Sequence, residues 1–147
     1  MIKPYYEEEG IQMKTERARI IQELDNILRE ILYIERGKKC EVCGRTTGIG
    51  VAHIRRKGRY HRIRWHRVNV LILCWLPCHY HFDTKRDDPR AERVIRYIEK
   101  IRGDSFENVK LELAALDKIQ PRLTKFELYR KLAGLRMELE SLKGGKV

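Results

Sequence analysis

Two closely spaced pairs of cysteines place the strongest constraint on how this chain can fold. Cys40 and Cys43 are separated by two residues, Cys74 and Cys78 by three, and the 147-residue chain has no other cysteine. Each pair can present two thiolates from a tight turn, and two such turns can close a tetrahedral zinc site. The spacing therefore predicts one structural zinc ion, with a wider turn at the second pair. Two disulfides are the alternative, and they are less favoured because such pairs in an unexported chain more often bind metal.

The composition is that of a soluble protein with a modest core. Hydrophobic residues make up 42% of the chain, and no apolar run approaches the ~20 residues that span a bilayer. The first residues, MIKPYYEEEG, lack the basic and apolar regions of a signal peptide. We therefore expect a cytoplasmic protein that does not interact with membranes and that folds as one compact domain.

Basic residues are concentrated in the middle of the chain, whose formal net charge is +11. No acidic residue lies between Glu41 and Asp83. That interval contains eight basic residues: Arg45, Arg55, Arg56, Lys57, Arg59, Arg62, Arg64 and Arg67. A localised field of one sign is typical of a polyanion-binding surface, and nucleic acid is the usual polyanion. A solvated basic loop and an anionic membrane surface are the alternatives. The membrane is disfavoured because the stretch lacks an amphipathic helical pattern.

Amphipathic helices are expected on both sides of this basic region. Apolar residues recur at helical spacing over 11–36, and Gly37 ends the pattern. Their broad stripe suits burial against C-terminal helices or a homodimer. Further helices are predicted over 89–102, 105–119 and 124–143. Capping boxes are predicted from Asp104 to Glu107 and from Thr124 to Glu127. The chain accordingly divides into segments 1–37, 38–88 and 89–147.

Three further side chains that could take part in catalysis or metal binding are interleaved with the cysteine pairs. His53 lies in the strand-like segment GIGVAHIR, and Asn69 opens NVLILC, an apolar strand that ends on Cys74. His79 directly follows the last cysteine, where a helix can begin. Taken singly, such a histidine is more often a core or surface residue than a catalytic one. Their order and spacing resemble the HNH endonuclease family. The arrangement CxxC…AHI…R…RW…NV…LC…CH looks most like phage NinG-type recombination endonucleases, and the resemblance covers roughly residues 38–90.

The resemblance implies a fold and a reaction. The fold is α+β, with a small zinc-stabilised ββα-metal motif embedded among about four α-helices. The reaction is metal-dependent hydrolysis of phosphodiester bonds in DNA, and branched recombination intermediates such as Holliday junctions are the suggested substrate. The compartment is the cytoplasm, which is the host's if the protein is viral.

The resemblance also assigns roles to residues. His53 would accept the proton of the attacking water, Asn69 would orient the loop and the His53 ring, and His79 would bind a catalytic Mg²⁺ or Mn²⁺ ion. The basic loop (residues 55–67) would bind the nucleic-acid backbone, with Tyr60 and Trp65 available to stack or to pack. Its binding residues would be Arg55, Arg56, Lys57, Arg59, Arg62, Arg64 and Arg67.

One position departs from the family's pattern. Many HNH enzymes have an ion-binding aspartate before the first histidine, and here that position is Ala52. If a helix begins at residue 79, His79 and Asp83 share one face while His81 points away. We therefore predict His79 and Asp83 as ligands, with His81 in reserve. Asp83 as a helix N-terminal cap, and an ion held mainly by substrate phosphate and water, are the alternatives.

Two other functions are compatible with these residues. A non-catalytic zinc-knuckle protein would use the same cysteines and basic loop to bind nucleic acid, with the histidines as further contacts. It predicts binding that depends on salt concentration without any cleavage. A structural or assembly protein would act through its helices, and this function leaves the eight unopposed cations without a use.

Overall fold

The computed structural model describes residues 15–117 and 122–144. The described residues fall into two compact units, one from Arg29 to Arg122 and a smaller one that combines residues up to 28 with those from 123 onward. Helix α2 (Glu16–Arg36) contributes to both units, so this division differs from the three segments drawn from the sequence. None of the helices in the described ranges is both long and apolar enough to cross a membrane.

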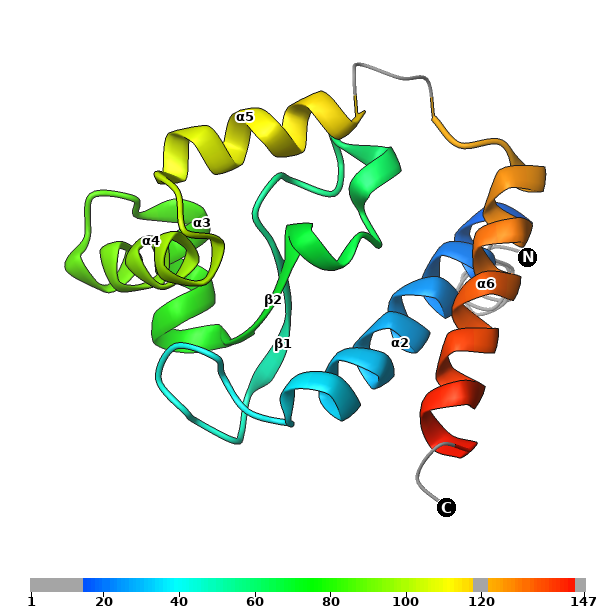
Figure 1. Cartoon of the computed structure of the whole chain (residues 1–147), viewed down its shortest axis with the longest axis horizontal. Coiled ribbons are helices and arrows are strands. Elements are labelled where there is room, and N and C mark those ends of the chain that lie inside the picture. Colours follow the sequence, from blue (N-terminus) through cyan, green and yellow to red (C-terminus); the bar gives the residue numbers. More distant parts are fainter. Residues whose placement is uncertain (1–14, 118–121, 145–147) are drawn as a thin grey trace, which may run out of the picture. The chain divides into compact units, whose positions relative to one another are not determined.

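The smaller unit contains the first part of α2 and helix α6 (Lys125–Gly144), which are labelled in Figure 1. Both helices bury an apolar face. The buried residues are Ile20, Leu24, Leu28, Leu128, Leu132, Leu135 and Leu139. Ion pairs join the two helices: Lys125 Nζ lies 3.0 Å from a Glu16 oxygen, and Arg136 pairs with Glu23. The stripe predicted for the first helix is therefore buried within the chain at these positions.

The ends of these two helices follow local capping rules. The Thr15 hydroxyl accepts a backbone N–H of the first turn of α2 at 3.1 Å, and the helix ends before Gly37, whose φ is 92°. Residues 11–14 of the predicted helix lie outside the described residues. Thr124 and Glu127 form the predicted capping box, because each side chain accepts the other residue's backbone N–H, at 3.1 and 2.8 Å.

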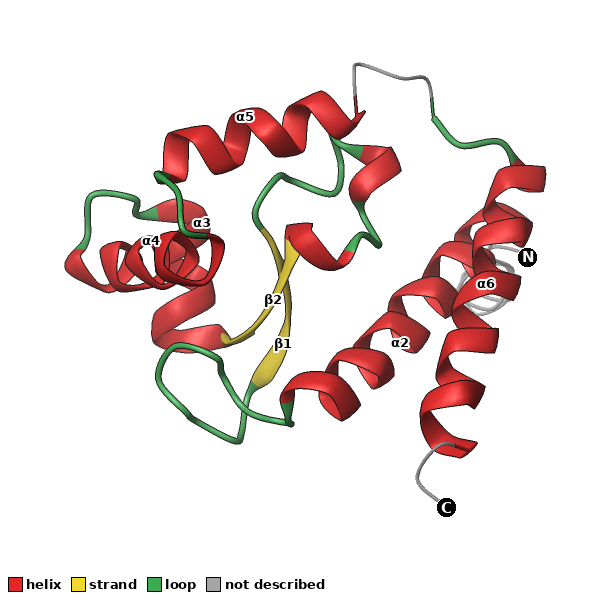
Figure 2. Ribbon diagram, viewed as in Figure 1, coloured by secondary structure: helices red, strands yellow, loops and turns green. Residues whose placement is uncertain are grey.

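The larger unit is built on a pair of antiparallel strands, drawn in yellow in Figure 2, and it is α+β as predicted. His53, the last residue of β1, lies opposite Val70, the first residue of β2. The described elements of the unit after α2 are β1 (Ile49–His53), two 3₁₀ turns (His61–Ile63 and Arg67–Asn69), β2 (Val70–Cys74), a wide π-type turn (Trp75–His79), α3 (Tyr80–Thr84), α4 (Pro89–Arg102) and α5 (Phe106–Asp117).

One apolar cluster joins both strands to the three helices that follow them. It includes Ala52 of β1, Leu71 and Leu73 of β2, Phe82 of α3, Val94 and Ile98 of α4, and Phe106, Val109 and Leu113 of α5. All five residues of β2 are buried, which is why this strand is a continuous apolar run without polar alternation. The cluster fixes β1, which carries His53, and α3, which begins directly after His79.

Capping residues mark both ends of α4 and the start of α5. The Asp88 side chain accepts a backbone N–H of the first turn of α4 at 2.8 Å, and Gly103, with φ 67°, ends that helix. The start of α5 differs from the prediction. The Ser105 hydroxyl accepts the first-turn N–H at 3.2 Å, whereas Asp104 accepts the N–H of Ser105. Residues 118–119 of the predicted helix lie outside the described residues.

A nearly buried carboxylate, that of Glu41, connects three elements. One of its oxygens accepts the Ile72 backbone N–H at 2.7 Å and an Arg36 guanidinium N–H at 3.1 Å, and the other accepts the Tyr97 hydroxyl at 2.6 Å. The Glu41 N–H donates to the Ile72 carbonyl at 2.8 Å, and Arg36 also donates to the Val70 carbonyl at 2.8 Å. Burial and the neighbouring carboxylate raise the pKa of Tyr97. Glu41 thus ties the end of α2 and helix α4 to β2.

Candidate functional site

The four cysteines come together as predicted. The Sγ atoms of Cys40, Cys43, Cys74 and Cys78 all lie within 4.8 Å of one another, and those of Cys43 and Cys74 are 3.6 Å apart. A tetrahedral zinc ion with ~2.3 Å bonds separates its sulfurs by ~3.8 Å. The cluster can therefore hold a metal such as zinc. Among residues 15–117 and 122–144, no other group of three or more His, Cys, Asp or Glu side chains is close enough to do so.

Two backbone turns build this cluster. In the first cysteine turn (residues 40–45), the Gly44 N–H donates to the Cys40 carbonyl at 2.9 Å, and the Cys43 N–H points at the Cys40 sulfur at 3.5 Å. Gly44 has a φ of 82°, a conformation that glycine adopts without strain. In the second cysteine turn (residues 74–79), Leu76 has extended backbone angles (φ −131°, ψ 130°) before the chain becomes helical at His79, so this turn is wider than the first. The wider second turn expected from the spacing is confirmed.

The electrostatics of the four thiols favour a bound cation. Burial opposes ionisation of Cys40, but backbone N–H groups directed at its sulfur outweigh burial and lower its pKa to about 7. Burial, and then the charge on Cys40, raise the pKa of Cys78. Thiolates packed this closely repel one another, so they cannot all ionise without a cation among them. Soft sulfur ligands that close all four positions are what a structural zinc ion requires.

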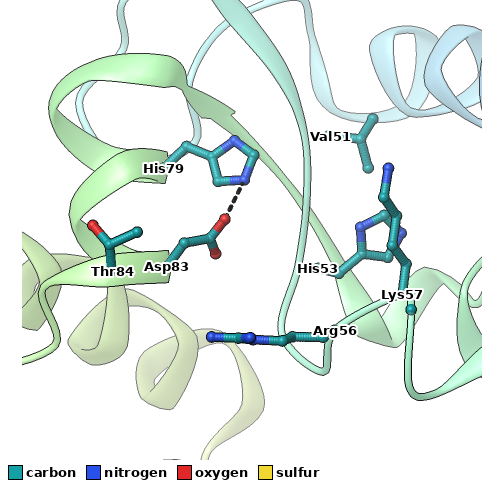
Figure 3. Close-up of a pocket in the computed structure, with 8 residues that line it drawn as sticks. Val51, His53, Arg56, Lys57, His79, Asp83 and Thr84 are labelled. Carbon is teal, nitrogen blue, oxygen red and sulfur yellow. Dashed lines mark ion pairs between the residues drawn. The ribbon is translucent and has the colours of Figure 1, made fainter.

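A pocket of about 400 Å³ lies between the end of β1 and helix α3, as Figure 3 shows. It is lined by Val51, His53, Arg56, Lys57, Gly58, His79, Asp83 and Thr84. These residues come from two segments that are far apart in the sequence. The pocket therefore brings together both predicted catalytic histidines, the predicted carboxylate ligand and two cations of the basic loop.

The His53 ring is held in one tautomer by the loop that follows β1. Its Nε2 atom lies 2.9 Å from the backbone carbonyl oxygen of Arg64. A carbonyl oxygen only accepts hydrogen bonds, so Nε2 carries the proton in this contact. In the neutral ring, Nδ1 is then the nitrogen that can accept a proton. This is the form of the ring that a general base requires.

His79 and Asp83 lie one helical turn apart at the start of α3. His79 Nε2 is 3.0 Å from an Asp83 oxygen, the contact drawn as a dashed line in Figure 3. Both side chains reach solvent, with exposed fractions of 21% and 44%. The expectation that the two side chains share one helix face is confirmed, because they contact each other directly across one turn.

The structure separates His81 from this pair. His81 is buried, and its Nδ1 lies 2.5 Å from the Pro77 carbonyl oxygen, so it does not line the pocket. Helical periodicity explains the difference, because a residue two positions along a helix points to another side. The position that precedes α3 is His79, so the alternative of Asp83 as its N-terminal cap does not hold.

Asn69 lies outside the pocket and organises the loop beside it. Its side chain is fully buried. The side-chain oxygen accepts the Arg55 N–H at 2.7 Å, and the side-chain nitrogen donates to the carbonyls of Arg55 and Ile63 at 3.1 and 3.3 Å. The amide therefore joins Arg55, the first residue of the basic loop, to Ile63, which directly precedes the Arg64 whose carbonyl contacts His53.

Replacing Asn69 with alanine should destabilise the protein by about 1–3 kcal/mol for each backbone group left without a partner. Asn69→Asp should also destabilise, because it keeps an acceptor for the Arg55 N–H and loses both donated bonds. Denaturant unfolding measures the change. Asn108→Ala, at an exposed asparagine of α5, is the matched control and should change stability by about 0.5 kcal/mol or less. An Asn69→Ala protein as stable as the wild type would contradict this assignment.

The cations of the basic loop divide into two groups. Arg56, Lys57 and Arg59 are exposed, and the first two line the pocket. Arg55 and Arg67 are half-buried and contact the protein itself. The Arg55 guanidinium donates twice to the Lys110 carbonyl of α5, at 3.0 and 2.8 Å, and Arg67 pairs with Glu35 at 3.0 Å.

The rest of the loop is also fastened to the protein. The Arg62 backbone N–H donates at 2.8 Å to Asp117, a buried carboxylate of α5. The Arg64 guanidinium lies 5.4 Å from the centre of the Trp65 ring. Trp65 is only 4% exposed, so of the two roles expected for it the structure shows packing. The exposed group of three cations is therefore the part of the loop best placed to contact a polyanion.

Three residues that shape the site were not predicted from the sequence. Lys110 and Asp117 fasten the basic loop from α5, and no local sequence signal points to either contact. Glu41 secures β2 next to the first cysteine turn. The sequence did offer a signal for Glu41, because this residue directly follows Cys40 and is the last acidic residue before the acid-free stretch.

No protein-family model matches this chain, and neither does any curated protein or solved structure. The family suggested by the motif pattern therefore stays a resemblance.

Proposed function

We propose that this protein is a zinc-stabilised, metal-dependent endonuclease of the HNH type that hydrolyses phosphodiester bonds in DNA. One observation carries the proposal: a strand–strand–helix segment brings His53, His79 and Asp83 to one pocket. The order of these elements agrees with the ββα-metal motif that the resemblance implies. A zinc ion at the four cysteines would tie the chain just before β1 to the turn between β2 and α3.

Two cations give the pocket its affinity for phosphate. Arg56 and Lys57 are exposed and line it, and Asp83 is the only carboxylate among its lining residues. In Figure 3 the Arg56 guanidinium extends from the His53 side of the pocket toward Asp83 and Thr84. Positive groups here attract the DNA backbone and offset the charge that develops on the phosphate during cleavage.

His53 is the general base of the proposed reaction. Nδ1 accepts the proton of a water molecule as the water oxygen bonds to phosphorus and the bond to the leaving oxygen breaks. The donated bond from Nε2 to the Arg64 carbonyl keeps the ring in place and stabilises the imidazolium that forms. Asn69 acts indirectly: it holds the loop that carries the Arg64 carbonyl, and this carbonyl positions the His53 ring.

His79 and Asp83 would hold the catalytic ion, Mg²⁺ or Mn²⁺. Two protein ligands are few, but Mg²⁺ is commonly bound by one or two carboxylates together with water and substrate phosphate. A bound divalent ion polarises the phosphate and stabilises the leaving oxygen. The cysteine cluster cannot serve this purpose, since four protein sulfurs would leave no open position on its metal.

A cleavage assay tests the proposal directly. Zinc-loaded protein is incubated with linear, nicked and four-way DNA, with and without added Mg²⁺ or Mn²⁺. Cleavage that requires the added ion is expected, and faster cutting of the four-way substrate would identify branched DNA as the preferred substrate. Binding without cleavage of any DNA with either ion would contradict a nuclease and favour the non-catalytic zinc-knuckle protein.

The exposed cations should bind the DNA backbone irrespective of sequence. Replacing Arg56, Lys57 and Arg59 together with alanine should weaken binding to all duplexes. The slope of log affinity against log salt concentration should fall by about 0.9 for each DNA phosphate that the variant no longer neutralises. Fluorescence anisotropy at several salt concentrations measures both quantities.

Arg55→Ala is the matched control for the triple variant. Its guanidinium is occupied by the Lys110 carbonyl, so its loss should lower stability and leave the salt slope nearly unchanged. A triple variant with the wild-type slope would show that this part of the loop faces away from the DNA.

A further inference from the structure

Trp75 is a large apolar side chain that stays mostly exposed, although its ring also makes an edge contact with the ring of Tyr80, with 5.9 Å between their centres. Its exposed fraction is 57%, whereas Trp65, the other tryptophan of the chain, is 4% exposed. The Trp75 ring makes an edge contact with the His79 ring, with 5.4 Å between their centres. His79 lines the pocket, so the indole contacts a residue of the pocket in which a phosphate would bind.

The main chain at Trp75 is held firmly. Trp75 lies between two cysteines of the cluster, and its N–H donates to the Gly48 carbonyl at 2.7 Å. Leu76, which follows it, is 51% exposed. A rigid aromatic side chain loses little conformational entropy when it contacts a partner, which suits it to binding.

Positive charge near the pocket indicates which kind of partner Trp75 meets. Arg56 and Lys57 line the pocket together with His79, whose ring the indole contacts. Lys39 and Arg45 are exposed next to the first two cysteines, whose sulfurs lie within 4.8 Å of that of Cys74. An exposed aromatic ring next to a pocket lined by cations matches a single-stranded nucleic acid, whose bases stack on aromatic side chains while its phosphates meet positive charge.

We propose that Trp75 stacks on an unpaired base next to the phosphate bound in the pocket, with Leu76 against the neighbouring nucleotide. This inference rests on the proposed function and narrows its substrate class. In an intact duplex both faces of a base are covered by its neighbours, and exposing one costs unstacking energy. DNA with a gap, a flap or a branch already offers such a face, so Trp75 selects it over continuous duplex.

The test compares binding of two DNAs that differ only in a single-stranded gap. Cleavage is prevented by using His53→Gln protein without added Mg²⁺ or Mn²⁺. Gapped DNA should bind more tightly than continuous duplex and should quench tryptophan emission. Trp75→Ala should weaken binding to gapped DNA roughly 5- to 150-fold, as expected when one base stack is removed. Its affinity for continuous duplex should be nearly unchanged.

Two further variants serve as controls. Trp75→Phe keeps an aromatic face and should retain most of the preference for gapped DNA. Leu111→Ala removes a side chain of α5 that is 64% exposed and does not line the pocket, so it should leave both affinities unchanged. Zinc content confirms that each variant keeps the cysteine cluster.

Several results would overturn the inference. Unchanged affinity of Trp75→Ala for gapped DNA, or an equal loss on both DNAs, would refute base stacking while the nuclease proposal stands. Failure of the parent protein to bind any DNA would refute both proposals. Concentration-dependent association of the DNA-free parent protein that Trp75→Ala abolishes would show that a second copy of the chain covers this surface.

Discussion

Replacing His53 with alanine is expected to lower the rate of DNA cleavage by about 10²–10⁴-fold, the usual contribution of a general base. The DNA affinity should change little, because Arg56 and Lys57 remain in the pocket. The zinc content should not change, since His53 is not part of the cysteine cluster. Single-turnover cleavage, anisotropy and metal analysis on the same preparation measure the three quantities.

Two variants distinguish proton transfer from packing. His53→Gln can still donate a side-chain N–H to the Arg64 carbonyl but is not a base, so it should be as slow as the alanine variant. His61→Ala removes a histidine of the basic loop that does not line the pocket. This variant should cut DNA at nearly the wild-type rate. A His53→Ala enzyme that cuts at the wild-type rate would remove the proposed mechanism and leave a zinc-bound nucleic-acid binder as the better interpretation.

Replacing Cys40 with serine should unfold the larger unit. Structural zinc sites contribute apparent free energies of about 10–16 kcal/mol, and the net stability of a domain is only about 5–15 kcal/mol. Loss of the ion therefore removes a free energy about equal to the whole net stability of such a domain. The variant should contain no tightly bound zinc and should lose the cooperative thermal transition of this unit.

A conservative change at the most exposed cysteine provides the control. Cys43→His supplies another zinc ligand, and sites with three cysteines and one histidine are common, so this variant should keep its zinc. Cys43→Ser should lose it. A Cys40→Ser protein with one zinc per chain and the wild-type unfolding midpoint would contradict the cysteine cluster as a zinc site.

The cysteine cluster and β2 could be predicted because their signals are local. Metal-ligand spacing identified the four sulfurs, and an uninterrupted apolar run identified the buried strand. The shared face of His79 and Asp83 followed from helical periodicity once a helix was placed after Cys78. The Thr124 capping box was equally readable, since its two residues satisfy each other's backbone groups.

The partners of individual arginines could not be predicted, because they depend on long-range packing. A net count of charges treats Arg55 and Arg56 alike, yet one donates to a carbonyl 55 residues away and the other lines the pocket. Trp65 and Trp75 likewise look equivalent in the sequence, and the structure buries one while exposing the other. In each pair, two residues of the same type differ because different parts of the folded chain pack against them.

The hydrogen bonds of Glu41 and Arg36 also determine at which edge the two-stranded sheet can pair with a further strand. A strand at the rim of a sheet normally presents unpaired N–H and C=O groups to which another chain can add. On the side of β2 away from β1, the Ile72 N–H and carbonyl and the Val70 carbonyl are all taken by these two residues. An incoming strand would have to displace a nearly buried, charge-assisted network before it gained its first backbone bond. That side of the sheet is thereby closed to strand addition, and copies of the chain cannot aggregate through it by edge-to-edge pairing.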